Sequence, residues 1–301
     1  MATVIITPII IMGLLCASLY LPPIQEYATR KIESVVARNS EFSIKIGSLA
    51  LSFPFNLIIK DFELKKEGDC IACGDAIEIN INPLPLLRRE VEVNYILLKH
   101  INLDTHNIID GTHIAGKIGH LRSAIRNIDL NNQHANIRQL HLEGTNLKID
   151  ITNTTDSKKE PTPPIDWEIT LQKGSIRNSR IAIGLPQENT AIGAGIKQLT
   201  AYNLQAHLAS NSYKLKQLKI VGGSVAYDHG TQPREMEPLN HISAEDININ
   251  GRDFTYTPAT LSADIRQLSL MQPDGIEITS GSLAMTADST LIKIERATLN
   301  S

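Results

Sequence analysis

Cys70 and Cys73 are the first residues whose spacing could do chemistry, in the Cys-x-x-Cys pattern "CIAC". Two thiols at this spacing occur in redox pairs and in one half of many zinc sites. No second cysteine pair is available to complete a metal site, and the pattern lies where a strand should begin. We therefore interpret the two cysteines as structural, since a disulfide between them within a strand would be strained.

Three histidines recur every seven residues, at His106, His113 and His120. No carboxylate or cysteine joins them at the spacing of a metal site, and no His-Glu-x-x-His motif is present. Phosphate-binding glycine loops and nucleophile-elbow motifs are also missing from the sequence. We expect histidines on a polar face, no catalytic residues, no metal and no cofactor.

The composition bounds the class of protein. The 301 residues are 42% hydrophobic, which is enough to bury the core of one or two domains. The net charge is -3 and only 4% of the residues are aromatic, so neither a basic surface nor stacking platforms indicate a nucleic-acid partner.

Residues 4–21 contain no charge and are long enough for a single transmembrane helix. A cleaved signal peptide is the alternative. The basic Arg30 and Lys31 follow this segment, and the positive-inside rule alone would place the rest of the chain in the cytoplasm. Residues 24–39 have apolar side chains at helical spacing, which predicts an amphipathic helix that either covers one end of a domain or lies on the membrane surface.

The rest of the chain divides at a polar, proline-rich linker. We expect an anchor over 1–23, a first β segment with its helix over 24–152, the linker over 153–164, and a second β segment over 165–301. Within the first segment, 111–126 has apolar residues at spacings of three and four and predicts a helical insertion. Elsewhere apolar and polar residues alternate, as in "DAIEININ", which is typical of half-buried strands.

One phrase recurs four times, as "IRQLHL" (137–142), "IKQLTA" (196–201), "LKQLKI" (215–220) and "IRQLSL" (265–270). A phrase copied along the chain indicates a repeated strand, which must stack on its neighbours to bury its apolar face. We predict a mainly β fold, a long antiparallel sheet with one apolar face. Either two such sheets form a sandwich, or one sheet curls and leaves an apolar trough that would suit acyl chains; the low aromatic content favours the curled sheet.

Several stretches resemble the AsmA-like family, and most closely its TamB (translocation and assembly module) group in Bacteroidetes-type bacteria. They include "YATRKIESVVARN", "SIKIGSLALSFPFNLIIKDFELKK", "DAIEININPLPLLRREVEVNYILLKHINLD" and "YKLKQLKIVGGSVAYD". The resemblance implies one N-terminal helix in the inner membrane, with the bulk of the chain in the periplasm, and this replaces the topology suggested by charge. It also implies a repetitive curled sheet, or β-taco, with an apolar interior that carries phospholipid towards the outer membrane.

Members of this group are longer and end in a further β-rich domain, so we expect this chain to be an N-terminal portion or a short member. An alternative role is that of a scaffold for outer-membrane protein assembly with a BamA-like partner, contacted through that further region. Under the lipid hypothesis, the inward-facing aliphatic residues bind acyl chains. The predicted lining residues are Ile77, Ile79, Ile81, Val91, Val93, Leu140, Leu142, Leu218, Ile220, Ile247, Ile249, Leu268 and Leu270.

Overall fold

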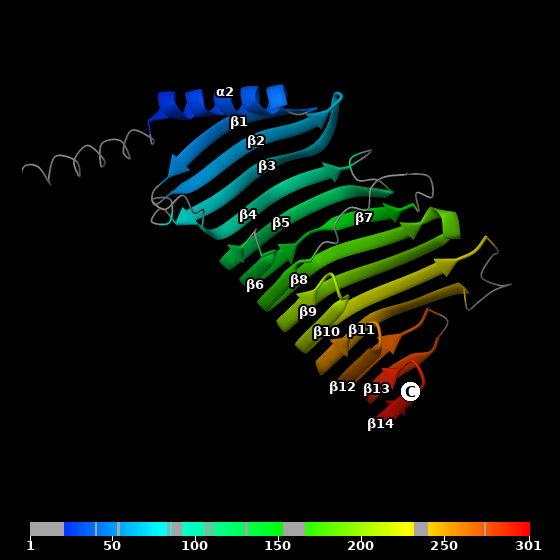
Figure 1. Cartoon of the computed structure of the whole chain (residues 1–301). Helices are drawn as coiled ribbons and strands as arrows, with labels where there is room; N and C mark the ends of the chain where they lie inside the picture. The colour runs from blue at the N-terminus through cyan, green and yellow to red at the C-terminus, as the bar shows by residue number, and fades with distance from the viewer. Residues whose placement is uncertain are drawn as a thin grey trace, which may run out of the picture.

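The computed structural model describes residues 21–39, 41–52, 55–82, 85, 92–105, 108, 111–129, 132–152, 166–231, 240–273 and 275–301. Residues 4–20 of the predicted anchor over 4–21 and the whole predicted linker over 153–164 lie outside these residues, as do Val91 and His106. Within the described part of the chain, no helix has the length and hydropathy needed to cross a membrane. Strands dominate this part, and they form one long sheet (Figure 1), which confirms the mainly β prediction.

Helix α2 (Pro22–Asn39) confirms the predicted amphipathic helix and lies along the first strand of the sheet (Figure 1). Two of its side chains bond to the backbone of that strand, β1 (Phe42–Ser52). Glu33 Oε1 accepts from the amide of Ile46 at 2.9 Å, and Gln25 Nε2 donates to the carbonyl of Leu51 at 3.4 Å. The helix therefore covers a strand edge that would otherwise be open to another chain.

Thirteen further strands follow β1 in the described chain. The strands are β2 (Asn56–Lys66), β3 (Asp69–Asn82), β4 (Glu92–Asp104), β5 (Thr112–Asp129), β6 (His134–Glu143), β7 (Asn146–Ile151), β8 (Glu168–Leu185), β9 (Thr190–His207), β10 (Ser212–His229), β11 (His241–Tyr256), β12 (Thr260–Met271), β13 (Glu277–Asp288) and β14 (Ile292–Asn300). A short 3-10 turn, η1 (Pro186–Glu188), connects β8 to β9. The strands lie in chain order except that β6 and β7 both pair with β5 and with β8.

The pairing of β8 corrects the expectation of a wholly antiparallel sheet. Both β6 and β7 run parallel to β8, whereas the other neighbouring pairs are antiparallel. A parallel pair needs a long crossover, and residues 152–167 supply the connection between β7 and β8. The same pairs join the predicted first and second segments into one continuous sheet, so a sandwich of two sheets is not what the described residues form.

The predicted helix over 111–126 is wrong, because these residues belong to strand β5. Two of the residues that suggested a helical face, Ile118 and Leu121, are three residues apart because the strand bends between them. The bend lies at Gly119, which is missing from the pairing with β4. A Cβ atom on Gly119 would come within 2.6 Å of the carbonyl oxygen of Glu143, so glycine lets the end of β6 approach.

A first bend crosses the sheet and is marked by one residue each on β2, β4, β8 and β10. Asp61, His100, Asn178 and Gly222 have φ values of 51°, 47°, 45° and 64°, and none has a partner in the strand registers. This left-handed conformation interrupts the alternation of side chains, as a bulge does. Apolar residues on the two sides of the bend are consequently three residues apart rather than two.

A second bend crosses the strands from β5 to β12. Each copy of the repeated phrase lies at one of the two bends. In each copy, the first apolar residue and the leucine are three residues apart, and the basic residue between them is skipped by the strand register. These basic residues are Arg138, Lys197, Lys216 and Arg266. The phrase is therefore the sequence signature of a bent strand: apolar residues before and after the bend, and a charged residue at it.

The most buried hydrophobic side chains lie beside the bends. At the first bend Ile46 is paired with Phe62, and Ile101 lies beyond Phe62 with one strand between them. The exposed fractions of Ile46, Phe62 and Ile101 are 7%, 6% and 4%. Ile125 and Leu171 occupy the corresponding place at the second bend and are also buried. Side chains are most crowded on the inside of a bend, so the sheet curves towards the face that carries these residues.

Candidate functional site

A single row of aliphatic side chains crosses the whole sheet. Each member is the register partner of the next, from β1 to β14, with β7 outside the row and glycine at β13. We call this set the central apolar row: Leu49, Ile59, Ile77, Leu98, Leu121, Leu142, Ile176, Leu199, Ile220, Ile249, Leu268, Gly281 and Leu299. Directly paired residues point to the same face of a sheet, so the row is continuous on one face.

A second row runs beside the central apolar row. On the first strands each of its members is two residues away from the central-row member of the same strand. It contains leucine or isoleucine on most strands and small residues on the others. Its members are Leu51, Leu57, Ile79, Ile96, Ser123, Leu140, Gly174, Ala201, Leu218, Gly251, Ile265, Leu283 and Ala297. The apolar face is therefore two aliphatic side chains wide on most strands and narrows where Ser123, Gly174, Gly251 or Gly281 takes the place of a large residue.

This face is not covered in the described structure. The large side chains of the central row up to β12 are half-buried, whereas a packed core would bury them almost completely. Leu299, at the end of the row on β14, is 64% exposed. A contiguous apolar surface of this extent is unusual on a soluble monomer and generally marks a site of interaction.

The predicted lining residues that the structure describes fall into a regular pattern. Ile77, Leu142, Ile220, Ile249 and Leu268 belong to the central apolar row, and Ile79, Leu140 and Leu218 belong to the second row. The other four lie outside both rows, with Ile81 paired with Val93, Ile247 with Gly223 and Leu270 with Ile278. Val91 is outside the described residues.

Sequence reasoning missed eight members of the central row: Leu49, Ile59, Leu98, Leu121, Ile176, Leu199, Gly281 and Leu299. Leu121 belongs to the segment predicted as a helix, because the bend at Gly119 places it three residues from Ile118. Leu199 lies in the repeated phrase "IKQLTA" at the place that leucine takes in the other copies, so the repeat itself could have identified it. Leu98 and Ile176 become recognisable only when the strand registers are known.

Tyr95 shows how a bulge changes the face of a side chain. Regular alternation would place it beside Val93, but Asn94 is an extra residue in the register between β3 and β4. Tyr95 therefore points to the polar face, where its hydroxyl donates to Glu78 Oε1 at 2.5 Å. This hydrogen bond to a carboxylate, together with partial burial, raises the pKa of Tyr95 to about 12.

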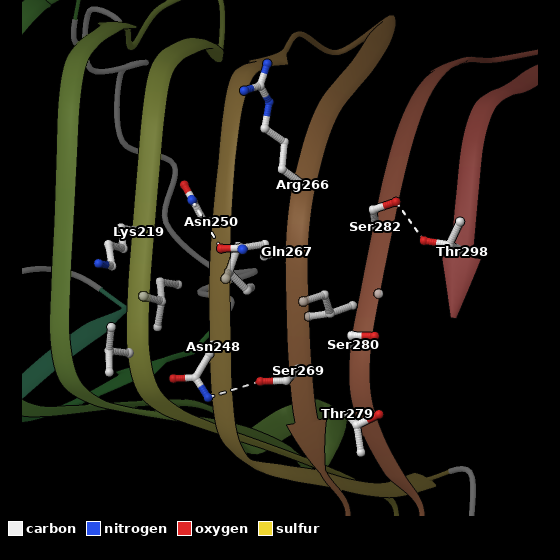
Figure 2. Close-up of a pocket in the computed structure, with 15 residues that line it drawn as sticks. Lys219, Asn248, Asn250, Arg266, Gln267, Ser269, Thr279, Ser280, Ser282 and Thr298 are labelled. Atoms are coloured by element: carbon white, nitrogen blue, oxygen red, sulfur yellow. Dashed lines mark hydrogen bonds between the residues drawn. The ribbon is translucent and has the colours of Figure 1, made fainter. Parts of the chain in front are cut away.

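The polar face is held together by side-chain pairs between strands. Over β10–β14 these pairs line a hollow of about 470 Å³ (Figure 2). Asn248 donates to Ser269 at 3.2 Å and Asn250 to Gln267 at 3.4 Å. Ser282 and Thr298 share a hydrogen bond of 2.8 Å.

Cys70 and Cys73 are free and half-buried on β3. Ile71 is an extra residue in the register with β2, so the two cysteines pair with Lys65 and Glu63, which lie on one face. Burial, followed by a hydrogen bond with Cys73, raises the pKa of the Cys70 thiol to about 11. A thiol in this state is a poor nucleophile at neutral pH.

The predicted histidines lie among carboxylates and other rings. His113 Nε2 is 2.8 Å from Asp104 Oδ1, and the ring of His120 packs edge-on against His100 with centroids 4.9 Å apart. Among the residues that the structure describes, no three or more metal-binding side chains gather at one point.

No protein-family model matches the sequence, and a comparison with curated proteins gives no match.

Proposed function

We propose that this chain binds phospholipid acyl chains along its apolar face and helps to move them from the inner membrane towards the outer membrane. The central apolar row is the observation that carries this proposal. A sheet that bends towards this face would form a groove along it, as the resemblance to the TamB group of the AsmA-like family implies. No catalytic residue is required for such a role.

The spacing of the row supports movement as well as binding. Thirteen strands at about 4.8 Å give a groove of roughly 58 Å. Each buried methylene contributes about 0.8 kcal/mol, and the lining is leucine or isoleucine at nearly every step. The binding free energy of an acyl chain is therefore similar at neighbouring strands, so the chain can advance by one strand without crossing a large free-energy barrier.

The N-terminal helix supports attachment to a membrane. Tyr27 and Val35 on α2 are 68% and 44% exposed, although the helix packs against β1 on another side. Exposed aromatic and aliphatic side chains on an amphipathic helix suit a membrane surface. This arrangement follows directly after the apolar segment 4–21 proposed as the inner-membrane anchor, with the sheet in the periplasm.

Two matched double variants test the proposal. Ile176→Asn with Leu199→Asn places two amides at paired positions of the central row, and Arg177→Asn with Gln198→Asn does the same at the paired, exposed positions beside them. We expect fluorescent phosphatidylethanolamine to bind about tenfold more weakly to the first variant, because half-buried aliphatic contacts worth at least about 1.4 kcal/mol are lost. Equal binding by both variants, with thermal unfolding confirming that both are folded, would argue against the apolar face as the site.

A scaffold for outer-membrane protein assembly is the second candidate, and strand β14 is the observation that favours it. In the described chain β14 pairs only with β13, and Ile292 and Ile294 are 65% and 58% exposed. An edge of this kind can accept a strand from a client or from a BamA-like partner by β-augmentation. Crosslinks from β14 to protein, in the absence of lipid adducts on the apolar face, would favour this role.

A further inference from the structure

Most side chains that line the hollow over β10–β14 alternate in sequence with members of the central apolar row, so they point to the opposite face of the sheet. Its lining contains the residues that flank the row members on β10–β13, for example Lys219 and Val221 beside Ile220, and it also includes the row members Ile220, Ile249, Leu268 and Gly281 that lie between them. It does not include the next apolar residues of the same strands, such as Leu218 and Ile247. Figure 2 shows the labelled amide and hydroxyl side chains on one side of the strands. The polar side chains of the hollow thus belong to the face opposite the proposed lipid groove.

The lining offers many hydrogen-bonding groups and no carboxylate. Amides come from Asn248, Asn250 and Gln267, and hydroxyls come from serines and threonines of β12–β14. Asn250 uses its amino group towards Gln267, which leaves its carbonyl oxygen to accept a further bond and the Gln267 amino group to donate one. Paired donors and acceptors of this kind match the hydroxyl groups of a polyol.

Positive charge gathers around this lining. Lys219 and Arg266 line the hollow, and Lys219 forms no ion pair with a described residue. Two residues before Arg266, the Asp264 carboxylate lies 2.8 Å from Arg252 Nε, 2.6 Å from Arg296 Nη2 and 3.5 Å from Arg266 Nε. Three guanidinium groups thus share this carboxylate.

The bulge at Arg266 explains how the cation reaches the hollow. Arg266 is the extra residue of β12 in its register with β11, and a bulge redirects the side chain that it carries. Arg296 is held in place by two further bonds, to Ser282 Oγ at 3.2 Å and to the carbonyl of Ile265 at 3.4 Å. A volume of about 470 Å³ falls within the range of small-ligand sites.

We propose that this outer hollow binds a phosphorylated polyol, with Lys219 and Arg266 contacting the phosphate and the amides and hydroxyls contacting the polyol. Lysine and arginine donate charge-assisted hydrogen bonds to phosphate, and the charge of the nearby Asp264 carboxylate is offset by three guanidinium groups. The same chemistry is presented by the phosphoglycerol headgroup of a membrane lipid and by a soluble phosphopolyol.

Calorimetric titration of the full chain with glycerol 1-phosphate tests the proposal. We expect saturable binding that is about tenfold tighter than that of glycerol or inorganic phosphate, because each of these presents only half of the required chemistry. The double variant Lys219→Gln, Arg266→Gln should lose about tenfold in affinity, whereas Lys214→Gln, a charge removed from the same strand outside the hollow, should bind as the unmodified chain does.

Flotation with phosphatidylcholine vesicles, with and without phosphatidylglycerol, separates the two sources. A phosphatidylglycerol-dependent gain that the double variant loses, and Lys214→Gln keeps, assigns the site to a lipid headgroup, whereas binding of the free glycerol phosphate alone assigns it to a soluble ligand. Absence of both, or equal binding by the double variant, overturns the proposal. Ile176→Asn with Leu199→Asn should leave this binding unchanged, so the result is independent of the lipid groove.

Discussion

Single residues decide where the strands bend and which face each side chain takes. Asp61, His100 and Asn178 adopt positive φ angles within strands, a conformation that short polar side chains tolerate better than branched ones. An extra residue such as Ile71 or Asn94 has a similar effect on its neighbours, because it shifts the alternation by one position. The amphipathic character of the sheet therefore depends on a few irregular positions.

The state of Cys70 can be measured directly. Because its pKa is raised to about 11 from 9.0, the thiolate fraction at pH 8 should be lower by roughly a hundredfold than that of an unperturbed thiol. In a Cys16→Ser, Cys73→Ser chain we expect slow alkylation by iodoacetamide at pH 8 and a steep rise above pH 10, followed by mass spectrometry. That variant removes the Cys73 hydrogen bond, but burial, the larger cause, remains. Alkylation at pH 8 as fast as that of the urea-unfolded chain would contradict this account.

At the scale of elements, the sequence predicts strands well where the alternation is regular, as in β3. It fails where a bend changes the spacing, because the residues of β5 then imitate a helix. The parallel pairing of β8 could not be predicted either, since it depends on which edge the chain reaches after the linker rather than on any local pattern. For the candidate site, local alternation picked out eight residues that fall in the two rows, but it could not give the register that aligns the rows.

The contact between β5 and β7 depends on a glycine. Gly116 has a φ of 138°, and a Cβ atom there would collide with the carbonyl oxygen of Asn146. We expect Gly116→Ala to lower the free energy of unfolding by about 3 kcal/mol, from backbone strain and steric overlap together. Gly193→Ala is the matched control on β9, where a Cβ would meet nothing within 4 Å, and should change stability by less than about 0.5 kcal/mol. Equal urea midpoints for the two variants would show that β5 and β7 do not approach so closely.

At the scale of the whole molecule, one sheet presents two chemically distinct faces. The central apolar row runs from β1 to β14 with β7 outside it and a glycine on β13, whereas the polar face carries hydrogen-bonded pairs and ion pairs. The two ends of the sheet also differ, since α2 covers β1 and no described element covers β14. A long surface that is apolar on one side and polar on the other is suited to carrying a molecule with the same division, such as a phospholipid.

Photocrosslinking in cells tests the central claim most directly. A photoreactive residue would replace Leu98, Ile176 or Leu199 in the central row, with Lys99, Arg177 or Thr200 as the neighbouring positions on the polar face. We predict phospholipid adducts at all three positions of the row and at none of the neighbours, because acyl chains lie along the apolar face from strand to strand. Protein adducts in place of lipid at the row, or lipid at both faces alike, would contradict a lipid-carrying groove.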